Sequence, residues 1–347
     1  MYDAIYPGRP WLDTEGKRIQ AHGGSVIYVD GTYYWYGENK EKTDGTTDIY
    51  HWGVRCYSSK DLYNWKDEGV IIPPEPEDLE SPLHPAICMD RPHIIYNEKT
   101  KKFVCWLKIR MADGSQVSTV MTADNILGPY TMIKKGLFPC GMSAGDFDLA
   151  VADDGKAYYY FERVHSEMIC ADLTDDYTDV TGYYSTHFPQ PGPPFVREAP
   201  AHFVRNGKHY LVTSGTTGYL PNPSEVAIAD SWHGPFRILG NPHPDDESNT
   251  SYHSQISDIF KVEGKKDLYI AMADRWVPER MHRRYEVYGK LYERYYIQKD
   301  ASAYAELKEN AEVHSTQLAD YVWLPFRFDG EMAYLDWRDE WRIEDYE

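Results

Sequence analysis

The sequence predicts an all-β fold, a five-bladed β-propeller that carries a helical insertion. Two recurring patterns and one exception to them support this prediction. The first pattern is a turn followed by an aromatic strand, and the second is a polar loop with Asp and then an aromatic residue. The exception is one charged stretch near the C-terminus. Successive copies of the first pattern lie roughly 50–70 residues apart, a period that suits four-stranded blades.

The first pattern occurs in five full copies and a partial sixth, and each copy is typical of a hairpin turn that leads into a strand. The full copies begin at Asp30, Lys101, Asp154, Asn206 and Gly264, and the partial copy begins at Asp329. Five copies and a terminal strand predict five blades, with the ring closed by joining the two ends of the chain. Such a ring is one domain, residues 1–347. The alternative is a sandwich of similar strands.

The second pattern follows the first along the chain, at 58–65, 122–130, 229–236 and, more weakly, 170–177. Residues 280–313 break both patterns, because they are rich in Glu, Lys, Arg, Ala and Leu and contain no Pro. This composition predicts a helical insertion. Its run of Tyr and Arg residues predicts a homo-oligomer formed through 280–313. The alternative is that the insertion packs on its own propeller.

The charge balance limits the partners. There are 36 basic and 55 acidic residues, a net charge of −19, which disfavours nucleic acid and anionic membranes and favours a neutral partner such as a glycan. No apolar run approaches the ~20 residues that span a bilayer. The first residues lack the features of a signal peptide, which predicts a cytoplasmic protein, or a secreted one whose leader has been removed. The five cysteines are interpreted as reduced core thiols. Without ligand spacing among His and Cys, the sequence predicts no metal site and no cofactor, and it leaves open an ion or a water at the propeller centre.

Three acidic residues, Asp90, Asp146 and Glu198, lie between strand signals, and each precedes an apolar strand. The innermost strands of a propeller start around its central channel, so such residues converge on one pocket. Convergent carboxylates are what glycoside hydrolysis requires, since one must protonate the leaving oxygen while a neighbour keeps its pKa high. For each residue alone, the alternative is a turn or cap residue.

Several motifs give the chain a resemblance to a known family. They are Gln-Ala-His-Gly-Gly at 20–24, Tyr-Trp-Tyr-Gly-Glu at 34–38, Asp-Arg-Pro at 90–92, Arg-Glu-Ala-Pro-Ala at 197–201, Thr-Ser-Gly-Thr-Thr-Gly at 213–218, Ser-Gln at 254–255, Asp-Arg-Trp at 274–276 and Tyr-Val-Trp-Leu-Pro at 321–325. On these motifs the chain resembles glycoside hydrolase family 43, within it the exo-β-1,3-galactanases, from about Pro10 to Trp341 except in the insertion. The resemblance implies an exo-acting, inverting hydrolase that releases terminal β-galactosyl units from galactan-type glycans.

The resemblance also implies residue roles. Glu198 matches the general acid. Asp90 stands where the subgroup usually has Glu, a residue that tunes the site or assists catalysis, and Gln255 matches a glutamine that holds the attacking water. Substrate-binding residues are expected at Asp146, Glu38, Thr217, His22 and Trp276.

The chain departs from the family in the first blade, where most members carry a catalytic base Asp. The corresponding stretch, 23–26, reads Gly-Gly-Ser-Val, so the water must be activated by Gln255 as an imidic acid, by Asp90, or by His22. An aromatic sugar contact of the subgroup is also absent from 112–117. Two alternatives therefore stay open: an α-L-arabinofuranosidase or related glycosidase, and a catalytically inactive propeller that binds glycans.

Overall fold

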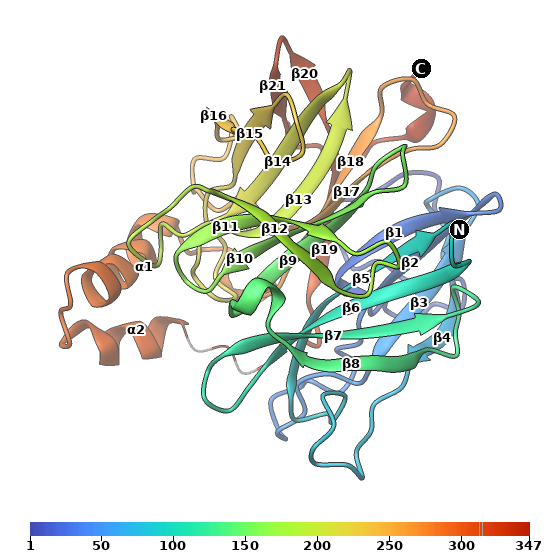
Figure 1. Cartoon of the computed structure of the whole chain (residues 1–347). Coiled ribbons are helices and arrows are strands. Elements are labelled where there is room, and N and C mark those ends of the chain that lie inside the picture. The colour runs from blue at the N-terminus through green and yellow to red at the C-terminus, as the bar shows by residue number, and fades with distance from the viewer. Residues whose placement is uncertain (312, 314) are drawn as a thin grey trace.

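The computed structural model describes residues 1–311, 313 and 315–347, and it shows the predicted five-bladed propeller (Figure 1). Four blades are four-stranded antiparallel sheets in which neighbouring strands follow the order of the chain. The fifth is a three-stranded sheet. The first strands of the five blades, β1, β5, β9, β13 and β17, contact one another in a closed ring. Their starting ends are where the candidate site residues lie.

The strands of each blade are adjacent in the sequence. Blade 1 contains β1 His22–Val29, β2 Thr32–Glu38, β3 Val54–Ser59 and β4 Lys66–Ile72. Blade 2 contains β5 Cys88–Asn97, β6 Lys102–Arg110, β7 Gln116–Ala123 and β8 Thr131–Leu137. Blade 3 contains β9 Ala144–Val151, β10 Ala157–Arg163, β11 Glu167–Leu173 and β12 Val180–His187. Blade 4 contains β13 Glu198–Arg205, β14 Lys208–Ser214, β15 Glu225–Ala229 and β16 Arg237–Gly240, and blade 5 contains β17 Gln255–Lys261, β18 Tyr269–Arg275 and β19 Asp320–Pro325.

The two sequence patterns occupy fixed places in the blades. The full copies of the first pattern form the turns between first and second strands, and the copies of the second pattern join third and fourth strands. Asp30 and Gly31 show why the first turn is tight, because both have positive φ, 47° and 78°, as a two-residue hairpin turn requires. The partial sixth copy forms a separate two-stranded sheet, β20 Arg327–Asp329 and β21 Met332–Tyr334, and begins no blade.

The ring is closed where the two ends of the chain meet. Ile5 and Trp341 exchange two backbone hydrogen bonds of 2.9 and 3.1 Å, and the Gly8 N–H donates to the Tyr321 carbonyl of β19 at 2.6 Å. The first residues thus lie beside the last strand of blade 5. An aromatic cluster fills the core at this closure and includes the buried Trp35, Trp65, Trp323 and Trp341, while Trp106 is fully buried in a separate cluster of blades 2 and 3. All five cysteines are free, and Cys56, Cys105 and Cys170 are buried as core thiols.

The helical insertion lies between β18 and β19 and projects from the propeller (Figure 1). It contains α1 Tyr285–Tyr292, a π-helical turn Glu293–Ile297 and α2 Ala303–Ala311, which confirms the predicted helix; residue 312 lies outside the described residues. Tyr288 and Tyr292 are buried within the same chain, and the Tyr288 hydroxyl donates to the Pro221 carbonyl. These rings therefore need no second subunit, and the homo-oligomer stays a prediction. Short 3-10 turns occur at Pro139–Gly141, Pro278–Arg280 and Ile343–Asp345.

Within the described ranges, none of the helices has the length and apolar character needed to cross a bilayer.

Candidate active site

A β-bulge interrupts the innermost strands of blades 2 and 4 directly after an acidic residue. The pairing register of β5 shifts just after Asp90, and that of β13 shifts just after Glu198. The next residue has positive φ in both strands, 53° at Arg91 and 47° at Ala199. A proline follows, which suits a position where the ladder lacks a hydrogen bond. The Asp-Arg-Pro and Glu-Ala-Pro motifs thus encode local bends beside the two carboxylates.

The bulges open onto one cavity of about 170 Å³. A cavity of this size suits one sugar ring better than a length of polymer. Six of the eight predicted site residues line it, and together they come from all five blades: Glu38, Asp90, Asp146, Glu198, Gln255 and Trp276. The rest of the lining is mostly polar and consists of Tyr50, Cys88, Arg91, Lys108, Arg110, Gln116, Gly218 and Tyr219.

Glu198 is a cavity carboxyl that favours its protonated form. The residue is 9% exposed. Burial raises the pKa of Glu198 well above its ordinary value, and the negative charges of Asp146 and Glu162 raise it further. Its Oε1 accepts a hydrogen bond of 3.1 Å from Nε2 of Gln255. A carboxylic acid that stays neutral near pH 7 is suited to donate a proton to a leaving oxygen.

Gln255 is held by four hydrogen bonds that fix the orientation of its amide. Its Oε1 accepts from Nη2 of Arg91 at 2.9 Å and from Nε1 of Trp276 at 3.2 Å. Its Nε2 donates to Glu198 and, at 3.0 Å, to Oγ of Ser214. Because Arg and Trp can only donate, the oxygen must face them. The imidic acid form of Gln255 would instead place an O–H group against these two donors. The geometry therefore favours the amide form, which orients Glu198.

Lys108 joins the carboxylates of blades 2 and 3. Its Nζ lies 3.0 Å from Oδ2 of Asp90 and 2.7 Å from Oδ1 of Asp146, and Nη2 of Arg91 lies 3.0 Å from Oδ2 of Asp146. Burial raises the pKa of both carboxyls, but these neighbouring cations, with Lys40 for Asp90, outweigh burial and hold each pKa below its ordinary value. Both groups are therefore ionised at neutral pH, and both can accept hydrogen bonds from a sugar or a water.

Glu38 fills the space beside the first-blade position that lacks a carboxylate. Burial raises the pKa of Glu38 to about 7, against the opposing effect of Lys40, whose Nζ lies 2.8 Å from its Oε2. Its Oε1 accepts the Arg91 backbone N–H at 3.0 Å. A Cβ at Gly23, which has a φ of 58°, would lie 2.3 Å from this same oxygen. Glycine is thus required at 23, because a side chain there would collide with the Glu38 carboxylate.

The structure does not bring the remaining two predicted residues, His22 and Thr217, into the cavity. His22 is fully buried, and its Nδ1 lies 2.9 Å from Oδ1 of Asp274 while its ring stacks on Tyr321 at 4.7 Å. The Thr217 hydroxyl is also buried, and it serves hydrogen bonds within its own loop. The sugar contacts expected of these two residues do not match their positions. Instead, His22 packs behind Trp276, 5.6 Å between ring centroids, and supports the cavity wall.

Sequence reasoning missed the basic groups of the cavity and one of its hydroxyls. Arg91 lies in the Asp-Arg-Pro motif, but no function was predicted for it from the sequence. Lys108 could have been found, because it is a charged residue in the otherwise apolar stretch of β6. Tyr50, whose hydroxyl donates to Oδ1 of Asp90 at 2.8 Å, lies in a loop without a sequence signal. Gln116 lines the cavity from the stretch in which the aromatic sugar contact is absent.

Aromatic rings, including some from the helical insertion, lie next to this cavity. Tyr219 packs edge-on against Trp276, with 5.2 Å between ring centroids. The Tyr292 hydroxyl lies 3.5 Å from the position a Cβ would take at the cavity-lining Gly218, and Tyr292 stacks on Tyr296 at 5.9 Å and 17°. Burial is the main cause of the raised pKa of Tyr292, and the nearby Tyr296 phenol and Glu198 carboxylate raise it further. The insertion therefore lies within electrostatic reach of Glu198.

Comparison with known proteins agrees with this geometry. A family model described as Glycosyl hydrolases family 43 matches residues 18–288. Among solved structures, a GH43 beta-1,3-galactosidase is 31% identical with a TM-score of 0.81, over 100% of this chain and 65% of the other. This chain thus spans just under two thirds of the length of that relative.

A second GH43 beta-1,3-galactosidase, solved with galactodeoxynojirimycin, is 29% identical with a TM-score of 0.79, over 98% of this chain and 100% of the other. An exo-beta-1,3-galactanase from Clostridium thermocellum is 26% identical with a TM-score of 0.76, over 99% and 67% of the two chains. A search of curated proteins finds no match to this chain.

Proposed function

The chain belongs to glycosyl hydrolases family 43, and from this premise we propose that it removes terminal β-1,3-linked galactosyl units from galactan-type glycans. One observation carries the proposal: a cavity with room for one sugar ring brings a carboxyl of raised pKa, Glu198, together with the ionised carboxylates of Asp90 and Asp146. The similarity to β-1,3-galactosidases over the whole chain supports the choice of sugar.

In the proposed reaction, Glu198 gives its proton to the glycosidic oxygen as the bond to the leaving sugar breaks. Burial and the charge of Asp146 keep that proton in place until the substrate arrives. Gln255 acts as a positioning residue, because its Nε2 holds Oε1 of Glu198 while its own oxygen is fixed from behind. The ionised Asp146 is available as an acceptor for sugar hydroxyls.

The attacking water needs a proton acceptor, and the cavity offers two carboxylates for that role. Asp90 is ionised at neutral pH but is a weak base, whereas Glu38 has a pKa of about 7. We assign the role to Asp90, because its side chain is 14% exposed, whereas that of Glu38 is only 2% exposed and offers a water far less surface. Asp90→Asn should lose turnover and recover it with added azide as a galactosyl azide. Azide rescue of Glu38→Gln, with none of Asp90→Asn, would move the role to Glu38.

The family resemblance implies that hydrolysis inverts the anomeric centre. A β-linked galactoside should then release α-galactose first, which proton NMR detects before mutarotation. Release of β-galactose first would contradict the inverting assignment.

The helical insertion supplies one wall for the leaving sugar in this proposal. Tyr292 lies against Gly218 and stacks on Tyr296, so the two rings offer an apolar face near Glu198. Tyr292→Ala should raise KM for β-1,3-galactobiose several-fold and leave KM for an aryl galactoside nearly unchanged. An equal rise for both substrates would mean that Tyr292 serves only to shape the whole cavity.

A substrate screen tests the proposed function. Aryl β-galactoside, aryl α-L-arabinofuranoside and β-1,3-galactan are offered to the wild type, to Glu198→Gln and to Glu98→Gln, a matched control at a surface carboxylate that is 78% exposed. We expect galactose from the first and third substrates, lost in Glu198→Gln and kept in Glu98→Gln. Preference for the arabinofuranoside would replace the sugar assignment, and binding of galactan without hydrolysis would identify a glycan-binding propeller.

A further inference from the structure

Blade 2 places an arginine and a glutamine side by side at the catalytic cavity. Arg110 ends β6, Gln116 begins β7, and the two residues are paired across the hairpin that joins these strands. Both line the cavity. Paired residues of neighbouring strands project from the same face of a sheet, and so do residues two apart along one strand. Arg110 therefore projects from the same face as Lys108, about 7 Å further along β6.

Arg110 differs from the other cations of the cavity, because the chain does not balance its charge. Lys108 lies within 3.0 Å of two carboxylates, and Arg91 lies 3.0 Å from one of them. Among the described residues, Arg110 has neither a hydrogen bond nor an ion pair, although the chain carries 55 acidic residues against 36 basic ones. Its side chain is exposed. The guanidinium is therefore accessible to a negatively charged ligand.

The Gln116 side chain also has no partner, and it is buried. The residue is only 8% exposed, and its Oε1 has no hydrogen-bond partner. Within the described part of the chain, its amide nitrogen has none either. The backbone of Gln116 is fixed, since its N–H donates to Oγ of Ser143 at 2.8 Å. A buried amide without partners is destabilising, and a ligand that both donates and accepts hydrogen bonds would satisfy it.

The helical insertion indicates which sugar unit this pair would meet. Burial and the Tyr295 phenol raise the pKa of Tyr296, and the positive charge of Arg110 opposes them. Arg110 is therefore within electrostatic reach of Tyr296, one of the two rings assigned above to the leaving sugar. Lys108, two residues earlier on β6, pairs in register with Asp90. Arg110 and Gln116 thus lie beyond the ionised carboxylates, on the side of the leaving sugar.

We propose that Arg110 and Gln116 bind the carboxylate of an acidic leaving sugar, a hexuronic acid unit next to the terminal galactosyl unit; this inference rests on the proposed function. A guanidinium matches a carboxylate with two parallel N–H donors. The Gln116 amide adds one donor for the same group and one acceptor for a sugar hydroxyl. A neutral leaving sugar leaves the charge of Arg110 unpaired, so the two residues select acidic units.

Three disaccharides that differ only at C6 of the leaving sugar test this site. They are β-D-galactosyl-(1→3)-D-galactose, its galacturonic acid analogue and its galactose 6-sulfate analogue. In the wild type, kcat/KM should be about 10-fold higher for the uronic acid than for the neutral disaccharide, mainly through a lower KM. A ratio near one would overturn the proposal. A stronger preference for the sulfate than for the uronic acid would also overturn it, because the site would then select a different anion.

Substitutions of Arg110 locate the effect. Arg110→Met should bring the ratio of the two kcat/KM values to about one, and Arg110→Lys should keep part of the preference, because it retains the charge without the planar fork. The matched control is Arg338→Met, which alters an exposed arginine outside the cavity and should keep the wild-type ratio. A wild-type ratio in Arg110→Met would contradict the assigned site.

A binding measurement separates this inference from the proposed function. Calorimetry with Glu198→Gln should show the uronic acid disaccharide bound about 10-fold more tightly than the neutral one. Cleavage of the neutral disaccharide without preference for the acid would overturn the acidic-sugar site alone. If the wild type cleaves neither disaccharide but Glu198→Gln still prefers the acid, the proposed function fails and the site stands. Equal binding of the two disaccharides, or binding of neither, would overturn the site.

Discussion

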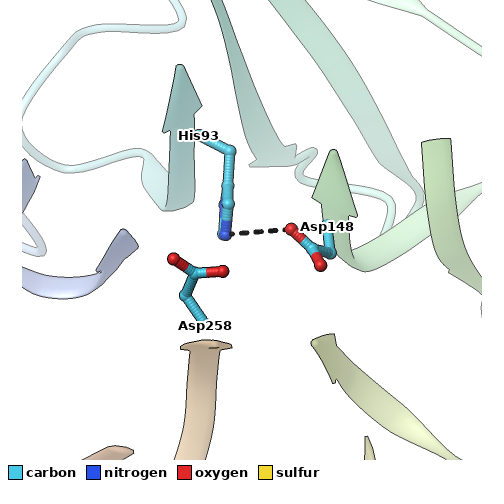
Figure 2. A group of neighbouring side chains, drawn as sticks. All are labelled: His93, Asp148 and Asp258. Atoms are coloured by element: carbon cyan, nitrogen blue, oxygen red, sulfur yellow. Dashed lines mark ion pairs between the residues drawn. The ribbon is translucent and has the colours of Figure 1, made fainter. Parts of the chain in front are cut away.

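Two groups of buried carboxylates lie on the innermost strands of this propeller, and they differ in how their charge is balanced. In the catalytic cavity, the Lys108 ammonium lies within 3.0 Å of both Asp90 and Asp146, and Arg91 completes the set. At the ring centre, Asp148 and Asp258 face only the neutral side of His93, a hydroxyl and backbone N–H groups (Figure 2). The chain thus supplies its own cations in the catalytic cavity, whereas, among the described residues, neutral donors alone satisfy the carboxylates at the centre.

The largest expected effect comes from removing the acid of the catalytic cavity. Glu198→Gln should lower kcat on β-1,3-galactan by about 10²–10⁴-fold, because protonation of the leaving oxygen contributes that much. The loss should be smaller on an aryl galactoside whose leaving group needs no proton. An equal loss on both substrates would show that Glu198 is not the proton donor.

A second change makes the catalytic cavity resemble the ring centre. Lys108→Met removes the cation shared by Asp90 and Asp146, so the pKa of each should rise and each should protonate at higher pH. The acidic limb of kcat/KM against pH should therefore move to higher pH. Circular dichroism checks the fold. An acidic limb that does not move would mean that these carboxylates do not control activity.

A third change adds a negative charge to the catalytic cavity. In Gln255→Glu, one carboxylate oxygen can still accept from Arg91 and Trp276. The other oxygen replaces the amide nitrogen that donates to Oε1 of Glu198 in the wild type. The new carboxylate should raise the pKa of Glu198 further, hold its proton more tightly and lower kcat by about 10-fold. Gln255→Ala serves as the comparison without added charge. Wild-type activity in Gln255→Glu would instead support residue 255 as the base.

The smallest expected effect on activity comes from changing the ring centre alone. Asp258→Asn keeps the shape of the side chain but removes a buried negative charge. Because Asp258 does not line the catalytic cavity, kcat on an aryl galactoside should stay within about twofold of wild type. Kinetics of both proteins at 25 °C provide the comparison. A loss of kcat as large as that of Glu198→Gln would contradict the separation of the two carboxylate groups.

The propeller was predictable because its repeats are local. The Asp30-Gly31 turn and its equivalents mark the first hairpin of each blade through residues that tolerate positive φ, and the Asp-aromatic loops mark the last. The bend that presents Glu198 was also encoded locally, in Glu-Ala-Pro. Composition alone located the helical insertion, because its charged and Ala-rich stretch contains no strand pattern.

Other parts of the site depend on contacts that sequence spacing does not reveal. Tyr50 reaches Asp90 across 40 residues from an irregular loop. His22 lies in a recognised motif, yet Asp274, 252 residues away, holds it behind the cavity wall. The ring-centre cluster of His93, Asp148 and Asp258 unites three blades, and no spacing in the sequence marks these residues as neighbours. The localisation and the oligomeric state stay predictions.

The protonation state of Glu198 is the most direct test of the account, because acid catalysis depends on it. Infrared difference spectra between wild type and Glu198→Gln, recorded across pH 4 to 9, isolate the carbonyl stretch of this one carboxyl. Burial and nearby negative charge raise the pKa of Glu198, so we predict a carboxyl that stays protonated in the wild type at pH values where an exposed Glu is already ionised, with a signal that is absent from the variant. A Glu198 carboxyl that ionises over the ordinary range of an exposed Glu would contradict the account.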